Sequence, residues 1–214
     1  MDLTSPEWDR SALLVIDVQR DFIDDDGSAH VPGTADIVPR LGRLVTAFRV
    51  AGRPIVHVIR LYRGEDVDLP RRQLVASGVS LVAPGSPGAS VPGVLFPEGD
   101  VDLDTTALLR GEFQQIGPTE YIAFKPRWSA FYRTGLHDWL RQQDVTTVVV
   151  AGCNLPNCPR ATLFDASARD YRTVLVPDVT SQVTPERLAD ARLIGTQIVE
   201  SGEIVARFSP AEGS

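Results

Sequence analysis

Strand-length apolar runs that alternate with helical patterns constrain the fold of this chain most. Five continuous runs rich in β-branched residues and a weaker sixth recur along it, at 12–16, 55–59, 121–124, 147–151, 173–176 and 203–206. Continuous apolar character is typical of strands that are buried on both faces, as in parallel sheets. The runs therefore predict six strands.

Helical patterns fill the intervals between these runs. Apolar residues recur at helical spacing within 37–48, 136–140, 161–168 and 188–198. Strand–helix alternation predicts an α/β fold: a doubly wound parallel sheet flanked by helices, with right-handed crossovers. A chain of 214 residues fits one domain, over 1–214. Residues 61–118 are instead rich in Pro, Gly and Asp, and a long irregular insertion of this kind usually serves as a functional loop or lid.

Composition narrows the class of protein. Hydrophobic residues make up 43% of the chain and charged residues 23%, which is ordinary for a globular protein. We expect no membrane span, no secretory signal and, with two cysteines, no disulfide framework, all of which suit the cytoplasm. The formal net charge of −7 argues against nucleic acid as a partner and favours a neutral or cationic small molecule.

Cys158 lies where an apolar run is followed by a turn-rich loop and a helix-compatible segment. Pro159 suits the start of a helix, so we expect Cys158 at or near a helix N-cap. Free backbone N–H groups and the positive end of the helix dipole would favour a thiolate nucleophile there. The alternative is a buried structural thiol. Cys153 lies five residues earlier, which is not the spacing of a redox pair.

Two more reactive residues follow predicted strands. Asp17 ends the first run and Lys125 the third, while Cys158 follows the fourth. Sites in open α/β sheets form beyond the carboxyl ends of the strands, so we expect these three side chains to converge. A carboxylate can take the thiol proton and return it to a leaving amine, an ammonium can steady both charges, and backbone N–H groups near the helix start can hold an oxyanion. The set suits acyl transfer through a thioester.

These residues also carry a resemblance. The segments 17–22, 125–131 and 152–162 resemble, in order and spacing, the isochorismatase-like cysteine hydrolase superfamily, which includes nicotinamidases and N-carbamoylsarcosine amidases. The resemblance implies a six-stranded parallel sheet and places Asp17, Lys125 and Cys158 on the family's catalytic triad. It also implies a cis peptide bond between Cys153 and Asn154, and a homodimer or homotetramer. We assign the oxyanion hole to the N–H groups of Asn154 and Cys158.

The loop before the nucleophile departs from the common family pattern. Leu155-Pro156 stands where a Thr-Asp pair is usual, and this variant resembles a subgroup that includes streptothricin hydrolase, which opens a lactam in a cationic antibiotic. A substrate with a cationic portion is therefore one expectation, with the acidic residues of the insertion, Glu65, Asp66 and Asp68, near the pocket mouth. Arg71 and Arg72 are expected to face solvent rather than substrate.

Other candidates concern the pocket and a metal. Phe22, Trp128 and Phe131 are predicted to line an aromatic pocket, with ordinary core packing as the alternative. Nicotinamidases resembling this chain hold a metal with an Asp-x-His pair after the second strand, but the matching stretch here, 60–68, has no histidine. The three histidines are His30, His57 and His137, and no two share ligand spacing. We expect His57 in the core, His137 on an exposed helix face, and neither a metal nor another cofactor.

The sequence thus predicts a metal-independent cysteine amidohydrolase that cleaves a small amide or lactam. Asp17 would be the general base and acid, Lys125 would stabilise charge, and Cys158 would attack the carbonyl. The rival enzyme activities are nicotinamidase-like hydrolysis and vinyl-ether hydrolysis, and the latter needs no thiol. A catalytically silent binding protein on the same fold is the rival from another class.

Overall fold

A seven-stranded sheet organises the computed structural model, which describes residues 2–209. The strands are β1 (Ser11–Ile16), β2 (Ile55–Ile59), β3 (Gln114–Gly117), β4 (Glu120–Phe124), β5 (Thr147–Gly152), β6 (Arg172–Thr180) and β7 (Gln197–Ile198). Their order is β3-β4-β2-β1-β5-β6-β7, and every neighbouring pair is parallel except β3–β4. The predicted α/β class is confirmed.

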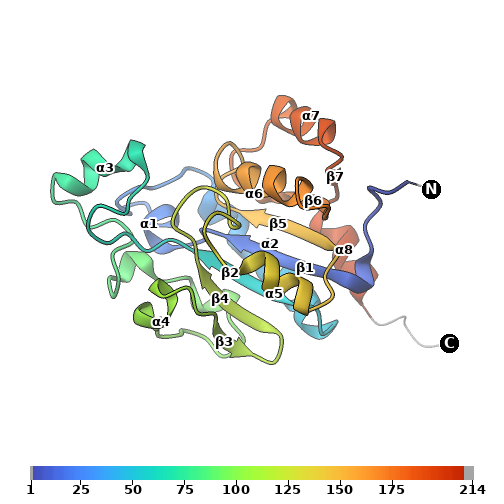
Figure 1. The fold of residues 1–214 in the computed structure, drawn as a ribbon, viewed down its shortest axis with the longest axis horizontal. Helices are drawn as coiled ribbons and strands as arrows, with labels where there is room; N and C mark the ends of the chain where they lie inside the picture. The colour runs from blue at the N-terminus through green and yellow to red at the C-terminus, as the bar shows by residue number, and fades with distance from the viewer. Residues whose placement is uncertain (1, 210–214) are drawn as a thin grey trace.

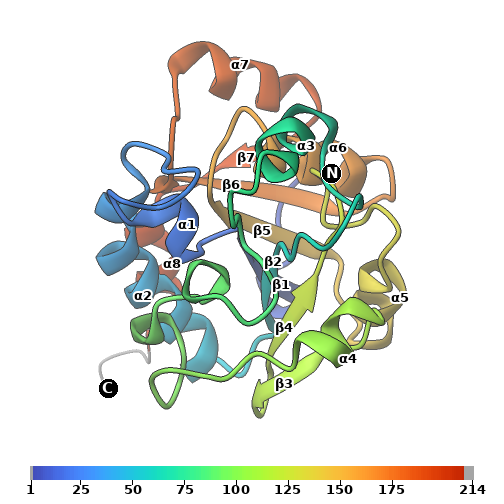
Figure 2. The ribbon, with the colours of Figure 1, turned by 90° about the vertical axis from the view of Figure 1, so that its left-hand side faces the viewer.

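Helices cover both faces of the sheet (Figures 1 and 2). The α-helices are α1 (Arg20–Ile23), α2 (Thr34–Val50), α3 (Leu69–Ala76), α4 (Thr105–Leu109), α5 (Leu136–Gln142), α6 (Cys158–Ser167), α7 (Pro185–Leu193) and α8 (Ser201–Phe208). Short 3-10 turns are η1 (Trp8–Arg10), η2 (Pro87–Ala89) and η3 (Gly93–Leu95). Figure 2 shows α2 and α8 on one side of the sheet and α5 and α6 on the other. No helix within 2–209 is both long and apolar enough to cross a membrane.

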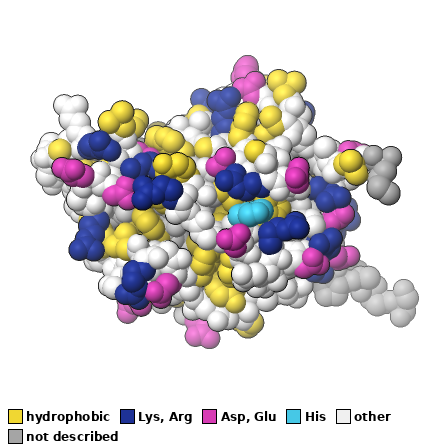
Figure 3. All heavy atoms as spheres, viewed as in Figure 1, with side chains coloured by type: hydrophobic (Ala, Val, Ile, Leu, Met, Phe, Trp, Pro, Cys, Tyr) yellow, Lys and Arg dark blue, Asp and Glu magenta, His cyan; other side chains and the backbone are white. Residues whose placement is uncertain are grey.

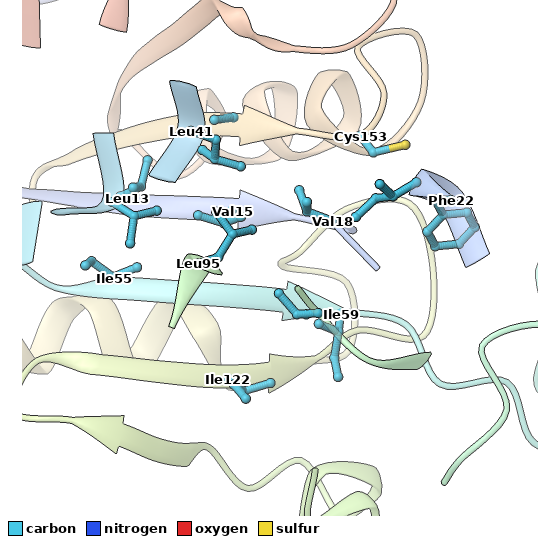
Figure 4. Close-up of a cluster of buried hydrophobic side chains, with 14 of the residues drawn as sticks. Leu13, Val15, Val18, Phe22, Leu41, Ile55, Ile59, Leu95, Ile122 and Cys153 are labelled. Atoms are coloured by element: carbon cyan, nitrogen blue, oxygen red, sulfur yellow. The ribbon is translucent and has the colours of Figure 1, made fainter. Parts of the chain in front are cut away.

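Alternate side chains of the central strands build two separate cores. Leu13 and Val15 of β1 pack with Leu41 of α2 in one cluster, which Figure 4 shows, while Leu14 and Ile16 belong to the cluster under α5 and α6. Every residue of β1 and β5 is buried. This two-sided burial explains why both strands read as continuous apolar runs in the sequence.

Two strand predictions need correction. The run at 203–206 is not a strand but lies within α8, where Ile204 is buried. Phe208 of the same helix packs edge-to-face on Phe48 of α2, with the ring centroids 4.9 Å apart. The i, i+4 spacing of Ile204 and Phe208 places both on one helix face, which a four-residue window does not reveal. The sheet is also not six-stranded and wholly parallel, because β3, from the predicted insertion, adds an antiparallel edge and the short β7 forms the other edge.

The order of the strands locates the functional edge. The chain moves outward from β1 through β2 to β4, and then crosses back to β5 on the other side of β1. The carboxyl ends of β1 and β5 therefore flank the topological switch point, where ligands bind in open α/β folds. Figure 1 shows α1 and α3 beyond this end of the sheet, so the 61–118 insertion contributes to its cover.

Gly152 allows β5 to end close against β1. Its φ is +115°, and a Cβ atom there would lie 2.2 Å from the carbonyl oxygen of Ile16. We expect Gly152→Ala to lower the free energy of unfolding by at least about 3 kcal/mol, since it adds a backbone clash to a φ that L residues avoid. Thermal melts should show a loss of roughly 6 °C or more.

Gly42→Ala is the matched control. Gly42 lies inside α2, and an added Cβ there would meet nothing closer than 3.8 Å. The control should gain about 0.5–1 kcal/mol, because alanine loses less conformational entropy in a helix. Equal effects of the two changes would contradict the close approach of β5 to β1.

Candidate active site

The three reactive residues predicted from the sequence meet at the carboxyl edge of the sheet. Asp17 follows β1, Lys125 follows β4, and Cys158 is the first residue of α6 after the β5 loop. Lys125 Nζ donates to Asp17 Oδ2 at 2.8 Å, and both the Asp17 carboxyl and the Cys158 thiol are almost completely buried. Asp17 has φ +50°, an uncommon conformation for a residue other than glycine and one that often occurs at functional sites.

Arg60 is the fourth member of this cluster, and the sequence analysis missed it. It follows β2 and is fully buried. Its Nε donates to Asp17 Oδ2 at 3.2 Å, and its Nη2 lies 3.2 Å from Cys158 Sγ. Its position after an apolar run was the available signal, since the same reasoning located Asp17 and Lys125.

Side chains of the insertion hold the far end of the Arg60 guanidinium. Arg60 Nη1 donates to the hydroxyl of Tyr62 at 2.7 Å and to the carboxylate of Asp68, which also accepts from Tyr62. Asp68 is buried, so it does not stand at a pocket mouth as expected. Asp66 is also paired, with Arg127 at 2.7 Å. Two of the three acidic residues thought to meet a cationic substrate therefore already have cationic partners.

Gln19 fixes the backbone of Arg60. Its side-chain Nε2 donates to the Arg60 carbonyl at 2.8 Å, and its Oε1 accepts from the Arg60 N–H at 2.8 Å. The same Nε2 also donates to the Ala89 carbonyl at 2.9 Å. Asp21, two residues later, accepts from the backbone N–H groups of Val82 and Ser28. The 17–22 segment thus supplies one carboxylate of the site and two hydrogen bonds to the insertion, from Gln19 to Ala89 and from Val82 to Asp21.

The site places two cations around one carboxylate. Burial raises the pKa of Asp17, but the positive charges of Lys125 and Arg60 lower it by more, so the carboxyl pKa lies below its usual value. Burial lowers the pKa of Lys125, and Arg60 lowers it further against the opposing effect of Asp17. Asp17 is therefore an ionised base at neutral pH. Its second oxygen, Oδ1, is buried and has no hydrogen-bond partner among the described residues.

The structure changes our view of the nucleophile. Cys158 does lie at the start of a helix, as predicted, but burial and the charge of Asp17 raise its pKa above the ordinary 9.0 despite Lys125 and Arg60. This direction of the pKa favours a neutral thiol at rest over the thiolate expected from the helix start. The neighbouring ionised Asp17 supplies the acceptor that such a thiol needs.

Cys153 is chemically different from Cys158. Burial raises its pKa to about 12, and its Sγ accepts a hydrogen bond from Thr34 at 3.6 Å. It packs in the core cluster with Val18 and Phe22 (Figure 4). Both cysteines are free thiols. Cys153 therefore has the surroundings of an inert core residue.

The loop between β5 and α6 contains the two amides predicted to form the oxyanion hole. The Cys153–Asn154 peptide bond is cis, as the resemblance implied. The neighbouring N–H groups of Cys153 and Leu155 donate to Ile16 and Ser181. Within residues 2–209, neither Asn154 nor Cys158 has an acceptor for its backbone N–H, so both amides are available as oxyanion donors.

Of the three predicted pocket aromatics, two lie beside the cationic cluster. The guanidinium of Arg60 lies 4.8 Å from the ring centroid of Trp128, and that of Arg71 lies 4.9 Å from Phe22. Arg71 is half-buried here and does not extend into solvent as expected, whereas Arg72 is exposed. Phe131 stacks with Tyr171 in one core cluster, with ring centroids 5.8 Å apart, and Phe22 is buried in the other cluster, so the alternative of core packing holds for both.

The histidines do not form a ligand set. His57 is buried and bonds through Nε2 to Glu120 at 2.8 Å, which confirms it as a core residue. His137 is half-buried rather than exposed, because the Tyr171 hydroxyl bonds to its Nδ1 at 3.0 Å, and His30 Nδ1 bonds to the Asp24 carbonyl. Within 2–209, no three His, Cys, Asp or Glu side chains are grouped closely enough to hold a metal ion.

Comparison with known proteins decides the family. The model described as "Isochorismatase domain" matches residues 11–197. The chain belongs to the isochorismatase family. A probable inactive nicotinamidase of Arabidopsis thaliana is 37% identical over 199 residues, covering 89% of this chain and 92% of that protein. A ureidoacrylate amidohydrolase of Methylobacterium radiotolerans is 30% identical, covering 85% of this chain and 70% of that protein.

A solved structure agrees with this assignment. An isochorismatase family protein from Desulfovibrio vulgaris superposes with a TM-score of 0.79 and 31% identity, covering 94% of this chain and 99% of that one. The family match spans the segments that carry Asp17, Lys125 and Cys158.

The electrostatic balance predicts an unusual response to Asp17→Asn. This change removes the negative charge that helps raise the pKa of Cys158 and leaves Lys125 and Arg60 facing the sulfur. The thiol should therefore ionise at lower pH, although the variant loses its base. The ultraviolet absorbance of the thiolate, titrated in a Cys153→Ser background, measures this midpoint. A midpoint that stays or rises would contradict the described charge balance.

Proposed function

We propose that the chain is a metal-independent cysteine amidohydrolase that cleaves a small amide through a thioester. The observation that carries this proposal is the buried contact of Asp17 with Lys125, beside a neutral Cys158 thiol and a free carboxylate oxygen. A thiol with a raised pKa becomes a nucleophile only when a base removes its proton. Asp17 is the base at hand.

The reaction begins when Asp17 takes the Cys158 proton and the sulfur attacks the amide carbonyl carbon. The N–H groups of Asn154 and Cys158 stabilise the resulting oxyanion. The C–N bond breaks as protonated Asp17 gives its proton to the leaving nitrogen, which leaves a thioester. Asp17 then takes a proton from water, and the hydroxide adds to the thioester carbonyl. The C–S bond breaks as protonated Asp17 returns this proton to the sulfur, which releases a carboxylic acid and restores the thiol.

Lys125 and Arg60 keep Asp17 a carboxylate between proton transfers. Both donate to the same oxygen, Oδ2, which leaves Oδ1 to handle the proton. Arg60 also lies against the sulfur and favours its anionic form as the thiol proton departs. In this proposal the guanidinium supplies the fixed positive charge beside the nucleophile, while Lys125 fixes the carboxylate.

Amides are the substrate class that the relatives favour. The curated relatives include ureidoacrylate amidohydrolases, and similar folds include an N-carbamoylsarcosine amidase from Thermoplasma acidophilum, with a TM-score of 0.71. A lactam substrate of the streptothricin type stays a prediction of the loop resemblance, as do the homodimer or homotetramer and the cytoplasmic location. The paired state of Asp66 and Asp68 removes most of the support for a cationic substrate.

A silent binding protein is the second candidate, because the Arabidopsis thaliana relative is described as probably inactive. An amide-library screen that reads released amine or ammonia separates the two. Turnover of any amide in proportion to intact Cys158 supports the enzyme. Stoichiometric binding of amides without release of product would favour the silent protein.

Substitution of the two cysteines tests the nucleophile. Cys158→Ala should abolish turnover, whereas Cys153→Ser should keep most of it, because the Cys158 sulfur contacts Arg60 of the charge cluster while the Cys153 sulfur is bound to Thr34 in the core. Asp17→Asn should lower kcat by roughly 10²–10⁴-fold, the usual contribution of a general base. Circular dichroism checks that each variant folds. Equal loss of activity from both cysteine changes would indicate a redox pair instead.

Resistance to chelation tests metal independence. The predicted enzyme uses Arg60 and Lys125 as its cations, and the stretch after β2 offers Arg60 and Tyr62 where metal ligands would be needed. Prolonged treatment with a strong chelator, followed by elemental analysis, should leave the rate unchanged. Activity that disappears on chelation and returns with added zinc or iron would overturn this part of the proposal.

A further inference from the structure

Arg71 is a guanidinium held beside the proposed active site with no carboxylate partner. It lies in the first turn of α3 and is half-buried between aromatic rings, 4.9 Å from the centroid of Phe22 and 5.8 Å from that of Trp128. Within residues 2–209 its side chain makes one long hydrogen bond, 3.4 Å to the Tyr62 hydroxyl, and no carboxylate lies within salt-bridge distance.

Two other arginines of this region are paired with carboxylates. Arg60 contacts Asp17 and Asp68, and Arg127 pairs with Asp66 at 2.7 Å. The buried carboxylates Asp17 and Asp68 are thus already bound by Lys125 and Arg60, and neither contacts Arg71. This local positive surplus stands within a chain whose net charge is −7. A desolvated guanidinium with free N–H donors is a strong receptor for a carboxylate, which it can bind through two parallel hydrogen bonds.

Arg71 is also close to the proposed nucleophile. It contacts Tyr62, Tyr62 contacts Arg60, and Arg60 Nη2 lies 3.2 Å from Cys158 Sγ. Both guanidinium groups lie over the ring of Trp128. Trp128 in turn lines a surface cavity of about 310 Å³ together with Asn157, the residue before Cys158. Trp128 thus lies between Arg71 and a cavity that also borders the residue before the nucleophile. Arg160 lines the same cavity and pairs with Asp190 at 3.7 Å.

We infer that Arg71 binds an anionic group, most simply a carboxylate, on the substrate, and that the substrate is a small amide bearing that group a few bonds from the scissile carbonyl. This inference rests on the proposed function for the identity of the reaction. It replaces the cationic substrate favoured by the sequence, because the acidic residues thought to receive a cation are mostly paired while a guanidinium is not.

Alkylation of Cys158 tests the inference without requiring turnover. The probes are N-chloroacetyl-β-alanine, which is anionic, and its neutral alcohol analogue, in which CH₂OH replaces the carboxylate. Mass spectrometry follows labelling of the Cys153→Ser protein at one pH, and the ratio of the two rates is compared with that for free glutathione. The variants are Arg71→Gln, Arg71→Lys and the matched control Arg72→Gln, which changes the neighbouring exposed arginine.

The folded protein should prefer the anionic probe by about 10- to 100-fold relative to glutathione, the range of a charge-assisted hydrogen bond. Arg71→Gln should abolish most of this preference, Arg71→Lys should retain part of it, and Arg72→Gln should leave it unchanged. A purely structural Arg71 would instead slow both probes equally. Equal slowing of both probes would overturn the inference, and so would the absence of any preference for the anionic probe. Equal effects of Arg71→Gln and Arg72→Gln, or failure of both probes to label Cys158, would also overturn it.

The outcome is separate from that of the proposed function. An anionic preference that depends on Arg71 in a protein that hydrolyses no amide would support the recognition site and refute the enzyme. Turnover of neutral amides with no dependence on Arg71 would support the enzyme and refute the recognition site.

Discussion

The buried charge cluster around Asp17 is the interaction on which the rest of the site depends. Lys125 and Arg60 are fully buried, and each would be very costly in that position without an anionic partner. Asp17 and Asp68 supply the two negative charges, so the cluster balances only when all four groups are in place. Loss of one carboxylate leaves an uncompensated buried cation, which links the stability of this sheet edge to the same groups that we propose for catalysis.

Sequence reasoning succeeded where a local signal coincided with a buried environment. The runs that became β1, β2, β4, β5 and β6 are continuous because helices cover both faces of the sheet, and Asp17, Lys125 and Cys158 could be placed together because parallel strands end at one edge. It failed at α8, since Ile204 and Phe208 contact α2 through a helical spacing that a short β-branched run conceals. Strand β3 has little apolar signal, because it is a half-exposed edge strand.

The errors at the site have an electrostatic origin. The helix start at Cys158 suggested a thiolate, but the sequence cannot show that burial and an ionised Asp17 oppose the helix dipole. The acidic residues of the insertion suggested a receptor for cations, and only the fold shows that Asp68 turns inward to Arg60. Charge counted along the chain gives −7, whereas the surroundings of Trp128 carry a positive surplus. Figure 3 shows both signs mixed over one face, so the net value describes no particular surface.

Gln19 has a wider consequence. Its side chain meets both the N–H and the carbonyl of Arg60, as the main chain of a neighbouring strand would. The side-chain amide thereby continues the hydrogen-bond pattern of the sheet after β1 has ended. The main chain is then free to turn into α1 at Arg20. The neutral amide of glutamine carries both a donor and an acceptor in the spacing of a peptide group, and asparagine is one methylene shorter. The geometry of the cationic cluster is thus encoded at a position that touches none of its charges, where a change to glutamate, despite its identical length, would set an anion against a backbone carbonyl.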